Sequence, residues 1–255
     1  MMVSMETLAG FGLVLLRTSA LFVSAPILGQ GSNFSGYKIV LLLSVALVLH
    51  VALGVPEISV DPVTFAALGV REVLLGAFLG FLLHLVTVAV HVGGEMVGHE
   101  MGFMVARQVD PVTGVQTTLT TNLYENLFLL AFLSMNGHHW LFRSLGESFE
   151  RAPIGQLSLG GGVADTSVRM FGEMFEAGIV FAAPVMVFLT LTSILIGLLA
   201  RSVPHLNVLE LGFSTRVLVA LGAMVLFAPM LEPAMNGLHD HFVLWLQRAL
   251  VAMEV

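Results

Sequence analysis

The amino-acid sequence predicts an all-α protein whose apolar helices are kinked or ended by Pro and Gly residues. Hydrophobic residues make up 57% of its 255 positions and charged residues only 11%, whereas a soluble domain carries about a quarter charged residues. The mean hydropathy is +0.95, and several apolar stretches approach the ~20 residues that cross a bilayer. These observations favour a polytopic membrane protein.

Composition also excludes several classes of function. With 10 Lys and Arg, the chain lacks the basic surface that is typical of nucleic-acid-binding proteins. It has no cysteine, which excludes a disulfide scaffold, a zinc finger and a thiol nucleophile. We therefore expect no nucleic-acid partner.

The apolar segments follow one another as six or seven predicted helices. They cover residues 8–28, 39–55, 65–92, 127–135, 177–200, 217–231 and 242–253. The first has Arg17 at its centre, and the third has Arg71 and Glu72 near its start. Segment 177–200 is the cleanest span, whereas 127–135 is too short alone and needs the polar residues before it. Several of these helices are therefore too short or too charged to stand alone in lipid.

Prolines and glycines interrupt the segments. Proline ends or kinks a helix, and small residues four positions apart let two helix backbones approach closely. The prolines inside or at the ends of apolar runs are Pro26, Pro56, Pro184, Pro204, Pro229 and Pro233. The spaced glycines are Gly76 with Gly80, and Gly94 with Gly98 and Gly102.

We expect neither catalysis nor a cofactor. The sequence contains no P-loop, no G-x-S-x-G elbow and no G-x-G-x-x-G fingerprint. His91, Glu95 and His99 are spaced four apart, and on one helix face they could bind zinc or iron. Phe103 stands where an H-E-x-x-H string requires its second His, and we predict no metal site.

Three charged residues inside apolar segments are candidate functional residues: Arg17, Arg71 and Glu72. A charge at mid-depth in a membrane costs several kcal/mol unless it is paired or wetted. The candidate partners of Arg17 are Glu72, Glu95 and Glu125. We favour a structural ion pair that locks helices together over the alternative, a proton relay.

The stretch 96–122 is a long polar segment between apolar helices, which is uncommon unless the segment is functional or disordered. Its Asp110-Pro111-Val112-Thr113-Gly114 run is a strong turn signal. The methionines that flank Phe103 offer a flexible apolar surface, as a deformable seal in a peptide-conducting channel would need. An ordinary surface loop with an apolar base is the alternative.

Five sequence blocks occur in order along nearly the whole chain. They are Arg17 with Ala25-Pro26-Ile27-Leu28-Gly29; Met101-Gly102-Phe103 through Ala106-Arg107 to Asp110-Pro111, Gly114 and Gln116; Gly137-His138-His139 with Ser148-Phe149 and Pro153-x-Gly155; Ala182-Ala183-Pro184; and Arg201-x-x-Pro204-x-Leu206-Asn207 with Gly212-Phe213. Together they resemble the FliR family of flagellar and type III secretion export-gate proteins, called SctT in the virulence systems. His205, Ser214 and the Phe34-Ser35-Gly36 run depart from the family pattern.

The resemblance implies an all-helical export-gate subunit built from kinked hairpins. It implies one copy of this chain assembled with FliP-type and FliQ-type subunits, with a FlhB-type protein docked outside. It further implies a FliP-like portion over residues 1–153 and a FliQ-like portion over residues 154–255. The expected location is the flagellar basal body in the bacterial inner membrane, where the gate conducts unfolded flagellar proteins.

By the same resemblance, the loop 102–121 is expected to plug the pore and to move when a substrate passes. The loop residues expected to matter are Gly102, Phe103, Met104, Arg107, Asp110, Pro111, Gly114 and Gln116. Their expected roles are an apolar seal for Phe103 and Met104, an electrostatic latch for Arg107 and Asp110, and bend points for Gly102, Pro111 and Gly114. The late hairpin motif comprises Arg201, Pro204, Asn207, Gly212 and Phe213.

We therefore predict a non-enzymatic gate subunit for flagellar rather than virulence-type secretion, in contact with membrane lipid. The alternative is a small polytopic secondary transporter, which would show paired halves with matching broken helices. The sequence has no such internal repeat. A further alternative is an intramembrane metalloprotein that uses His91, Glu95 and His99.

Overall fold

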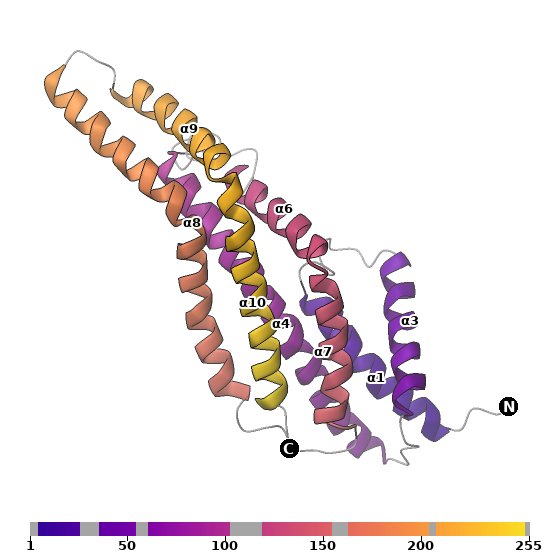
Figure 1. The fold of residues 1–255 in the computed structure, drawn as a ribbon. Helices are drawn as coiled ribbons and strands as arrows, with labels where there is room; N and C mark the ends of the chain where they lie inside the picture. Colours follow the sequence, from indigo (N-terminus) through magenta and orange to yellow (C-terminus); the bar gives the residue numbers. More distant parts are fainter. Residues whose placement is uncertain are drawn as a thin grey trace, which may run out of the picture. The chain divides into compact units, whose positions relative to one another are not determined.

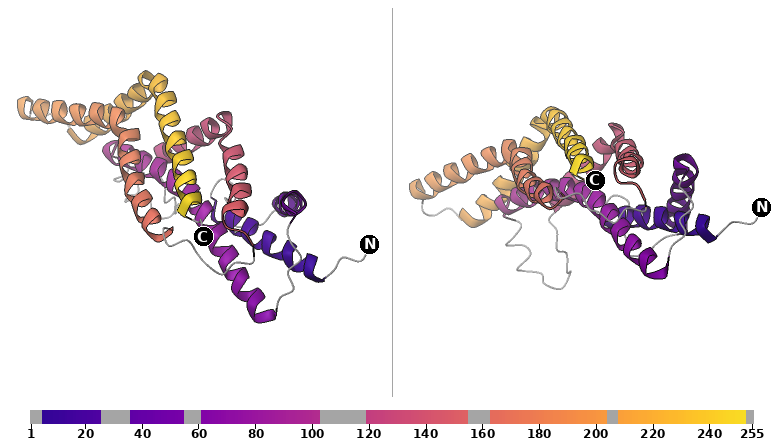
Figure 2. Two further views of the ribbon diagram at one scale, coloured as in Figure 1. Left: turned by 60° about the horizontal axis from the view of Figure 1, so that its bottom comes forward. Right: turned by 90° about the horizontal axis from the view of Figure 1, so that it is seen from below.

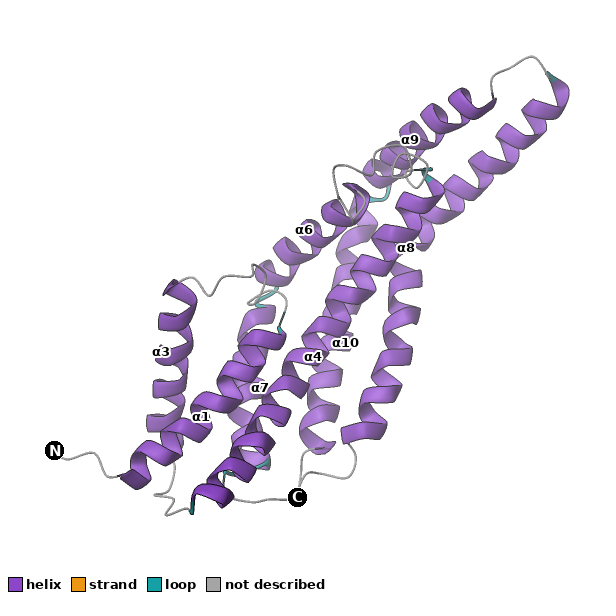
Figure 3. Ribbon diagram, turned by 180° about the vertical axis from the view of Figure 1, so that it is seen from behind, coloured by secondary structure: helices purple, strands orange, loops and turns teal. Residues whose placement is uncertain are grey.

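The structure is a computed structural model of the chain and describes residues 5–25, 36–54, 61–102, 119–154, 163–203 and 208–252. These ranges form eight helices and contain no strand (Figures 1 and 3). The helices are α1 (Met5–Ser24), α3 (Gly36–Leu53), α4 (Pro62–Glu100), α6 (Leu119–Ser134), α7 (Gly137–Arg151), α8 (Val163–Ser202), α9 (Val208–Leu226) and α10 (Ala228–Ala252). The predicted all-α fold is confirmed.

Three of the described helices are long and apolar enough to cross a membrane. The candidate spans are residues 6–24 of α1, 62–100 of α4 and 164–202 of α8. Helices α3 and α9 are apolar but shorter, over residues 38–53 and 212–226. The polytopic character predicted from composition is therefore confirmed.

Two predicted interruptions do not end their helices. Pro184 lies inside the 40-residue helix α8, and Pro233 lies inside α10. A proline inside a helix removes one backbone hydrogen bond and bends the axis, and α8 changes direction along its length (Figure 1). Helix α4 likewise continues through Gly94 and Gly98 for 39 residues. Segment 127–135 is completed by preceding polar residues, because α6 begins at Leu119.

The chain divides into two compact units, each assembled from segments that are distant in sequence. Unit 1 comprises Met1–Val86, Asn136–Phe171 and Asp240–Val255; unit 2 comprises Thr87–Met135 and Gly172–His239. The division predicted between residues 153 and 154 concerns likeness to two subunit types, and it stays a prediction.

In unit 1, helix α1 packs against α3 on one side and against α4 on another. The α1–α4 approach occurs at the predicted glycine pair. A Cβ atom on Gly76 would collide with the carbonyl oxygen of Arg17, and one on Gly80 would collide with the hydroxyl of Ser24. Small residues at this spacing therefore bring two backbones together, as predicted. The buried core around them includes Leu13, Leu21, Leu75, Leu79, Leu82 and Leu145.

In unit 2, glycines again mark the close approaches. A Cβ atom on Gly94 would lie 2.7 Å from the Cα atom of Thr121 in α6, and one on Gly178 in α8 would lie 2.7 Å from the Ala89 carbonyl oxygen. Helix α9 runs back beside the end of α8, which both views of Figure 2 show. The rings of Phe188 and Phe227 meet at 5.2 Å between centroids.

Candidate functional site

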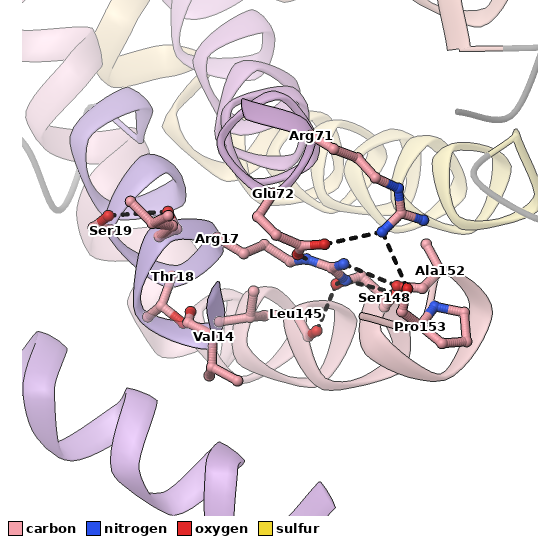
Figure 4. Close-up of polar contacts among 11 residues, drawn as sticks. Val14, Arg17, Thr18, Ser19, Arg71, Glu72, Leu145, Ser148, Ala152 and Pro153 are labelled. Atoms are coloured by element: carbon pink, nitrogen blue, oxygen red, sulfur yellow. Dashed lines mark hydrogen bonds and ion pairs between the residues drawn. The ribbon is translucent and has the colours of Figure 1, made fainter. Parts of the chain in front are cut away.

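Three charged side chains meet inside unit 1, where α1, α4 and α7 come together (Figure 4). Arg17 comes from α1, and Arg71 and Glu72 come from the beginning of α4. The side chains of Arg17 and Glu72 are 0% exposed and that of Arg71 is 3% exposed. Burial of a charge is strongly unfavourable unless partners replace the lost water, so the contacts of each group decide its role.

The Arg17 guanidinium donates a hydrogen bond from each of its three nitrogens. Nε donates to Glu72 Oε2 at 2.6 Å, Nη1 to the Ser148 carbonyl oxygen at 2.8 Å, and Nη2 to the Ala152 carbonyl oxygen at 2.8 Å. Nη1 also lies 3.2 Å from the Ser148 hydroxyl. The guanidinium carbon lies 4.0 Å from the centre of the Phe149 ring, a cation–π contact. Arginine's rigid fork of donors suits such a site.

Glu72 uses its second carboxylate oxygen to bind the other arginine. Arg71 Nη1 donates to Glu72 Oε1 at 2.9 Å and to the Pro153 carbonyl oxygen at 3.1 Å. One carboxylate thus faces two guanidinium groups, which leaves an excess positive charge in the cluster. Both arginines therefore need further acceptors, and Figure 4 shows both reaching the end of α7.

The end of α7 supplies those acceptors. The last carbonyl groups of an α-helix have no partner within the helix and form the negative end of its dipole. Ala152 is the C-cap of α7, and its N–H donates to the Ser148 carbonyl oxygen. The two arginines bind the Ser148, Ala152 and Pro153 carbonyls, so the cluster caps α7 while it joins α7 to α1 and α4. This geometry favours the structural lock over the proton relay.

Of the three carboxylates considered as partners of Arg17, Glu72 is the one that pairs with it. Glu95 and Glu125 belong to unit 2 and contact other residues there. Sequence reasoning missed the contribution of α7, because a backbone carbonyl has no sequence signature. The available signal was indirect: Ser148-Phe149 and Pro153 belong to one of the family-like blocks.

Most of the predicted plug loop 102–121 lies outside the described residues, and its last three residues, 119–121, belong to helix α6 rather than to a loop. Phe103, Met104, Arg107, Asp110, Pro111, Gly114 and Gln116 all lie outside the described residues. The first residue of the loop, Gly102, has φ +86°, and its N–H donates to the His99 carbonyl oxygen at 3.0 Å. Glycine adopts this left-handed conformation without the steric penalty of other residues, and the chain turns there immediately after α4.

Contacts between α4 and α6 join the two sides of this loop. The pairs are Thr121 Oγ1 to Glu95 Oε1 at 2.9 Å, Thr120 Oγ1 to the Gly94 carbonyl oxygen at 3.3 Å, and His91 Nδ1 to Glu125 Oε1 at 2.6 Å. Together with the close approach at Gly94, they fix where α6 begins relative to the end of α4. Sequence spacing alone did not pair these residues.

The residues weighed as metal ligands take part in these contacts. His91 binds Glu125, and Glu95 accepts a hydrogen bond from Thr121 while lying 3.8 Å from His99. Within the described ranges, no group of three or more His, Asp or Glu side chains is arranged to hold a metal ion.

The late hairpin motif is described in part. Pro204 and Asn207 lie outside the described residues, whereas Arg201 is exposed at the end of α8. Gly212 and Phe213 lie in α9, and a Cβ atom on Gly102 would lie 3.4 Å from the Phe213 ring. The late hairpin and the first residue of the predicted plug loop are therefore neighbours within unit 2, a relation that neither motif indicated by itself.

Comparison with known proteins relates the chain to bacterial export proteins. The model of the family described as bacterial export proteins, family 1, matches residues 8–242. The chain is 30% identical over 219 residues to the flagellar biosynthetic protein FliR of Escherichia coli (strain K12), covering 86% of this chain and 84% of that protein. It is 30% identical over 214 residues to FliR of Bacillus subtilis (strain 168), covering 82% of each.

A relative that is not named FliR also matches. The surface presentation of antigens protein SpaR of Shigella sonnei is 24% identical over 211 residues, covering 82% of this chain and 80% of that protein. These matches are to export proteins and not to enzymes or small secondary transporters. The chain belongs to the bacterial export protein family 1 and is a FliR-type membrane protein of flagellum biogenesis.

Proposed function

We propose that this chain is a subunit of the flagellar type III export gate and forms part of the channel for unfolded flagellar proteins. The observation that carries the proposal is 30% identity to FliR proteins of two bacteria over more than four fifths of each chain. The two relatives at 30% identity are both flagellar biosynthetic proteins, which supports the flagellar system. The proposed location is the basal body in the bacterial inner membrane.

The proposed partners are FliP-type and FliQ-type subunits and a FlhB-type protein. In this proposal residues 1–153 form the FliP-like portion and residues 154–255 the FliQ-like portion. The proposal of partner subunits is supported by the second half of α8, which exposes several large apolar side chains. They are Ile194, Leu195, Leu198 and Leu199, each more than half exposed. Such a surface needs lipid or another protein to cover it.

The loop 102–121 is proposed to plug the channel. Gly102 turns the chain after α4, and the α4–α6 contacts at Glu95 and Thr121 fix the far side of the loop. An anchored loop of this length can leave and re-enter a channel without rearranging the helices that carry it. Phe103 and Met104 would seal the channel, and the Arg107–Asp110 pair would latch the loop.

A secretion assay tests the function. Deletion of this chain's gene should remove flagellar proteins from the culture medium, and the full chain supplied in trans should restore them. As a control for specificity, general secretory export is measured in the same deletion strain. This export should be unaffected by the deletion. Undiminished release of flagellar proteins from the deletion strain contradicts the proposal.

Charge reversal tests the latch. Arg107→Asp and Asp110→Arg should each make cells that express the assembled gate leak small ions, and the double reversal should restore closure because it rebuilds the ion pair. The leak is measured as loss of membrane potential. Additive leakage in the double variant contradicts the latch. It does not contradict the proposal that the chain is an export-gate subunit.

A further inference from the structure

Near its beginning, helix α9 reaches the point where helix α4 ends, within unit 2. A Cβ atom built on Gly102 would lie 3.4 Å from Cδ2 and 3.9 Å from Cε2 of Phe213. The edge of the Phe213 ring therefore lies against the backbone of Gly102. This glycine is also where the chain leaves α4 and enters the loop that is proposed to plug the channel.

The Phe213 side chain is not part of the buried core. It is 42% exposed, whereas the neighbouring Gly212 is buried, and a Cβ atom on Gly212 would lie 3.8 Å from Cγ2 of Ile196 in α8. With 3.6 residues per turn, consecutive helix residues point in different directions. Gly212 thus packs against α8 while Phe213 contacts the end of α4, so α8 fixes where the Phe213 ring lies.

The direction of the chain at Gly102 needs a contact from outside the turn. The N–H groups of Met101 and Gly102 donate to the Val97 and His99 carbonyl oxygens, both at 3.0 Å, and the Met101 side chain is buried. These bonds hold the chain as far as the Gly102 nitrogen. Rotation at the Gly102 Cα atom then sets the direction in which the loop leaves. Its φ is +86°, but glycine adopts positive and negative φ about equally readily, so the residue itself does not select this turn.

We propose that Phe213 is a positioning residue for the plug loop. Its ring restricts rotation at Gly102 and so selects the direction in which the loop leaves α4. The other end of the loop is held by contacts between α4 and α6, such as that of Thr121 with Glu95, and these contacts do not involve α9. A movement of α9 relative to α4 therefore acts on one end of the loop.

The same helix carries part of the apolar surface that partner subunits would cover. Leu218 and Val225 of α9 are 71% and 77% exposed, and large exposed apolar surfaces mark sites of contact with other proteins or with membrane. A subunit that packs on this surface and shifts α9 would displace the Phe213 ring and release the Gly102 turn. This step rests on the proposed function, because it takes the loop as a plug and the chain as a gate subunit.

Hydrogen–deuterium exchange of the full chain in detergent tests the contact without reference to secretion. The amide protons of Met101 and Gly102 report opening of the turn, because exchange follows local opening. Phe213→Ala should speed their exchange about tenfold, which corresponds to a contact of about 1.4 kcal/mol. Phe213→Tyr keeps the ring and should exchange at the wild-type rate.

The matched control is Leu218→Ala, which removes a more exposed apolar side chain from the same helix. It should leave exchange at Met101 and Gly102 unchanged. Exchange in α7, most of which lies in unit 1, reports that each variant is folded.

Membrane potential and secretion give the functional readout in cells that express the assembled gate. Phe213→Ala should lower the membrane potential through a leak of small ions, while flagellar proteins still reach the medium and the complex still forms. Phe213→Tyr and Leu218→Ala should keep the gate closed. Joint loss of assembly and secretion in Phe213→Ala, without a leak, would make Phe213 a structural contact and would contradict the positioning role.

Three further results would overturn the proposal. The first is unchanged exchange at Met101 and Gly102 in Phe213→Ala. The second is equal acceleration in Leu218→Ala, which would mean that α9 loosens as a whole. The third is faster exchange with an unchanged membrane potential, which would mean that the turn does not control the loop. Failure of the proposed function is recognised separately, as continued secretion from the deletion strain, and it leaves the exchange result standing.

Discussion

The contacts of Arg17 require an arginine at this position. Its three nitrogens donate to the Glu72 carboxylate of α4 and to two backbone carbonyls at the end of α7. A lysine ammonium is a single point of charge on a flexible stem and cannot direct hydrogen bonds along the same fixed fork. Removal of either partner would leave buried charges and the α7 carbonyls without compensation.

We therefore predict that Arg17→Met and Glu72→Gln each lower the free energy of unfolding by about 3–5 kcal/mol, as expected when one partner of a buried ion pair is removed. Thermal unfolding of the purified chain in detergent measures the effect. The control is Arg143→Gln, which removes an exposed ion pair and should cost at most about 1 kcal/mol. An Arg17→Met variant as stable as this control contradicts the lock.

Tyr124 supplies a prediction for alkaline pH. It is buried in α6 with its ring 5.1 Å from that of Phe181, and burial raises the pKa of Tyr124 to about 12. Between pH 10 and 12 the unfolded chain loses this proton while the folded chain keeps it, so stability falls as pH rises.

The thermal midpoint of the wild type should accordingly fall more steeply between pH 10 and 12 than that of Tyr124→Phe, which keeps the ring and removes the ionisable hydroxyl. The difference should reach about 1–3 kcal/mol at the upper end, since one pKa unit is worth about 1.4 kcal/mol. Parallel curves for the two proteins would contradict the assignment.

The sequence predicted part of the buried cluster of Arg17, Arg71 and Glu72. Charges within apolar segments marked Arg17, Arg71 and Glu72, and the cost of burying them predicted that Arg17 has a partner. The choice among Glu72, Glu95 and Glu125 depended on which helices meet. That choice lies beyond the sequence, because Arg17 and Glu72 are 55 positions apart.

Helix packing in this chain is set by where glycines allow two backbones to touch. The sequence identified Gly76, Gly80 and Gly94 as small residues at close-packing intervals, and each one meets another helix. The sequence also predicted that prolines kink or end helices, and Pro184 and Pro233 lie inside α8 and α10 without ending them. A glycine that packs against a neighbouring helix is compensated by that contact, so α4 continues through residues 93–98.

A pair of glycine substitutions separates packing from helix propensity. Gly76→Ala should destabilise the chain, because its Cβ atom would collide with the rigid Arg17 backbone and force α1 and α4 apart. Gly172→Ala in α8 meets nothing within 4 Å, so it should stabilise by about 0.5–1 kcal/mol through helix propensity.

Thermal unfolding of both variants under one condition gives the comparison. The expected result is a midpoint below wild type for Gly76→Ala and at or above wild type for Gly172→Ala. Equal shifts in the two variants would show that the α1–α4 approach is not tight.

The whole molecule interleaves its two units along the sequence. Unit 1 contains the beginning, a central segment and the end of the chain, and unit 2 contains the two segments that lie between them. Composition and hydropathy predicted the helical membrane character, and the ordered blocks predicted the family. They could not predict this interleaving, because α4, α8 and α10 are continuous helices with residues in both units, and no composition change marks the crossing.

Many large apolar side chains of α8 and α9 are exposed in the isolated chain. Leu198 in α8 and Leu218 and Val225 in α9 are each more than half exposed, alongside many others. Large exposed apolar surfaces on a protein mark sites of contact with membrane or with other proteins. An assembly in which lipid and further subunits cover these faces agrees with this exposure.

We propose that this chain is a subunit of a hetero-oligomeric export gate. The most direct test is the native mass of the complex formed when the full chain is co-expressed with FliP-type and FliQ-type proteins from the same genome. We predict a stable hetero-oligomer that contains one copy of this chain together with both partners. A monodisperse homo-oligomer that binds neither partner would contradict the proposal.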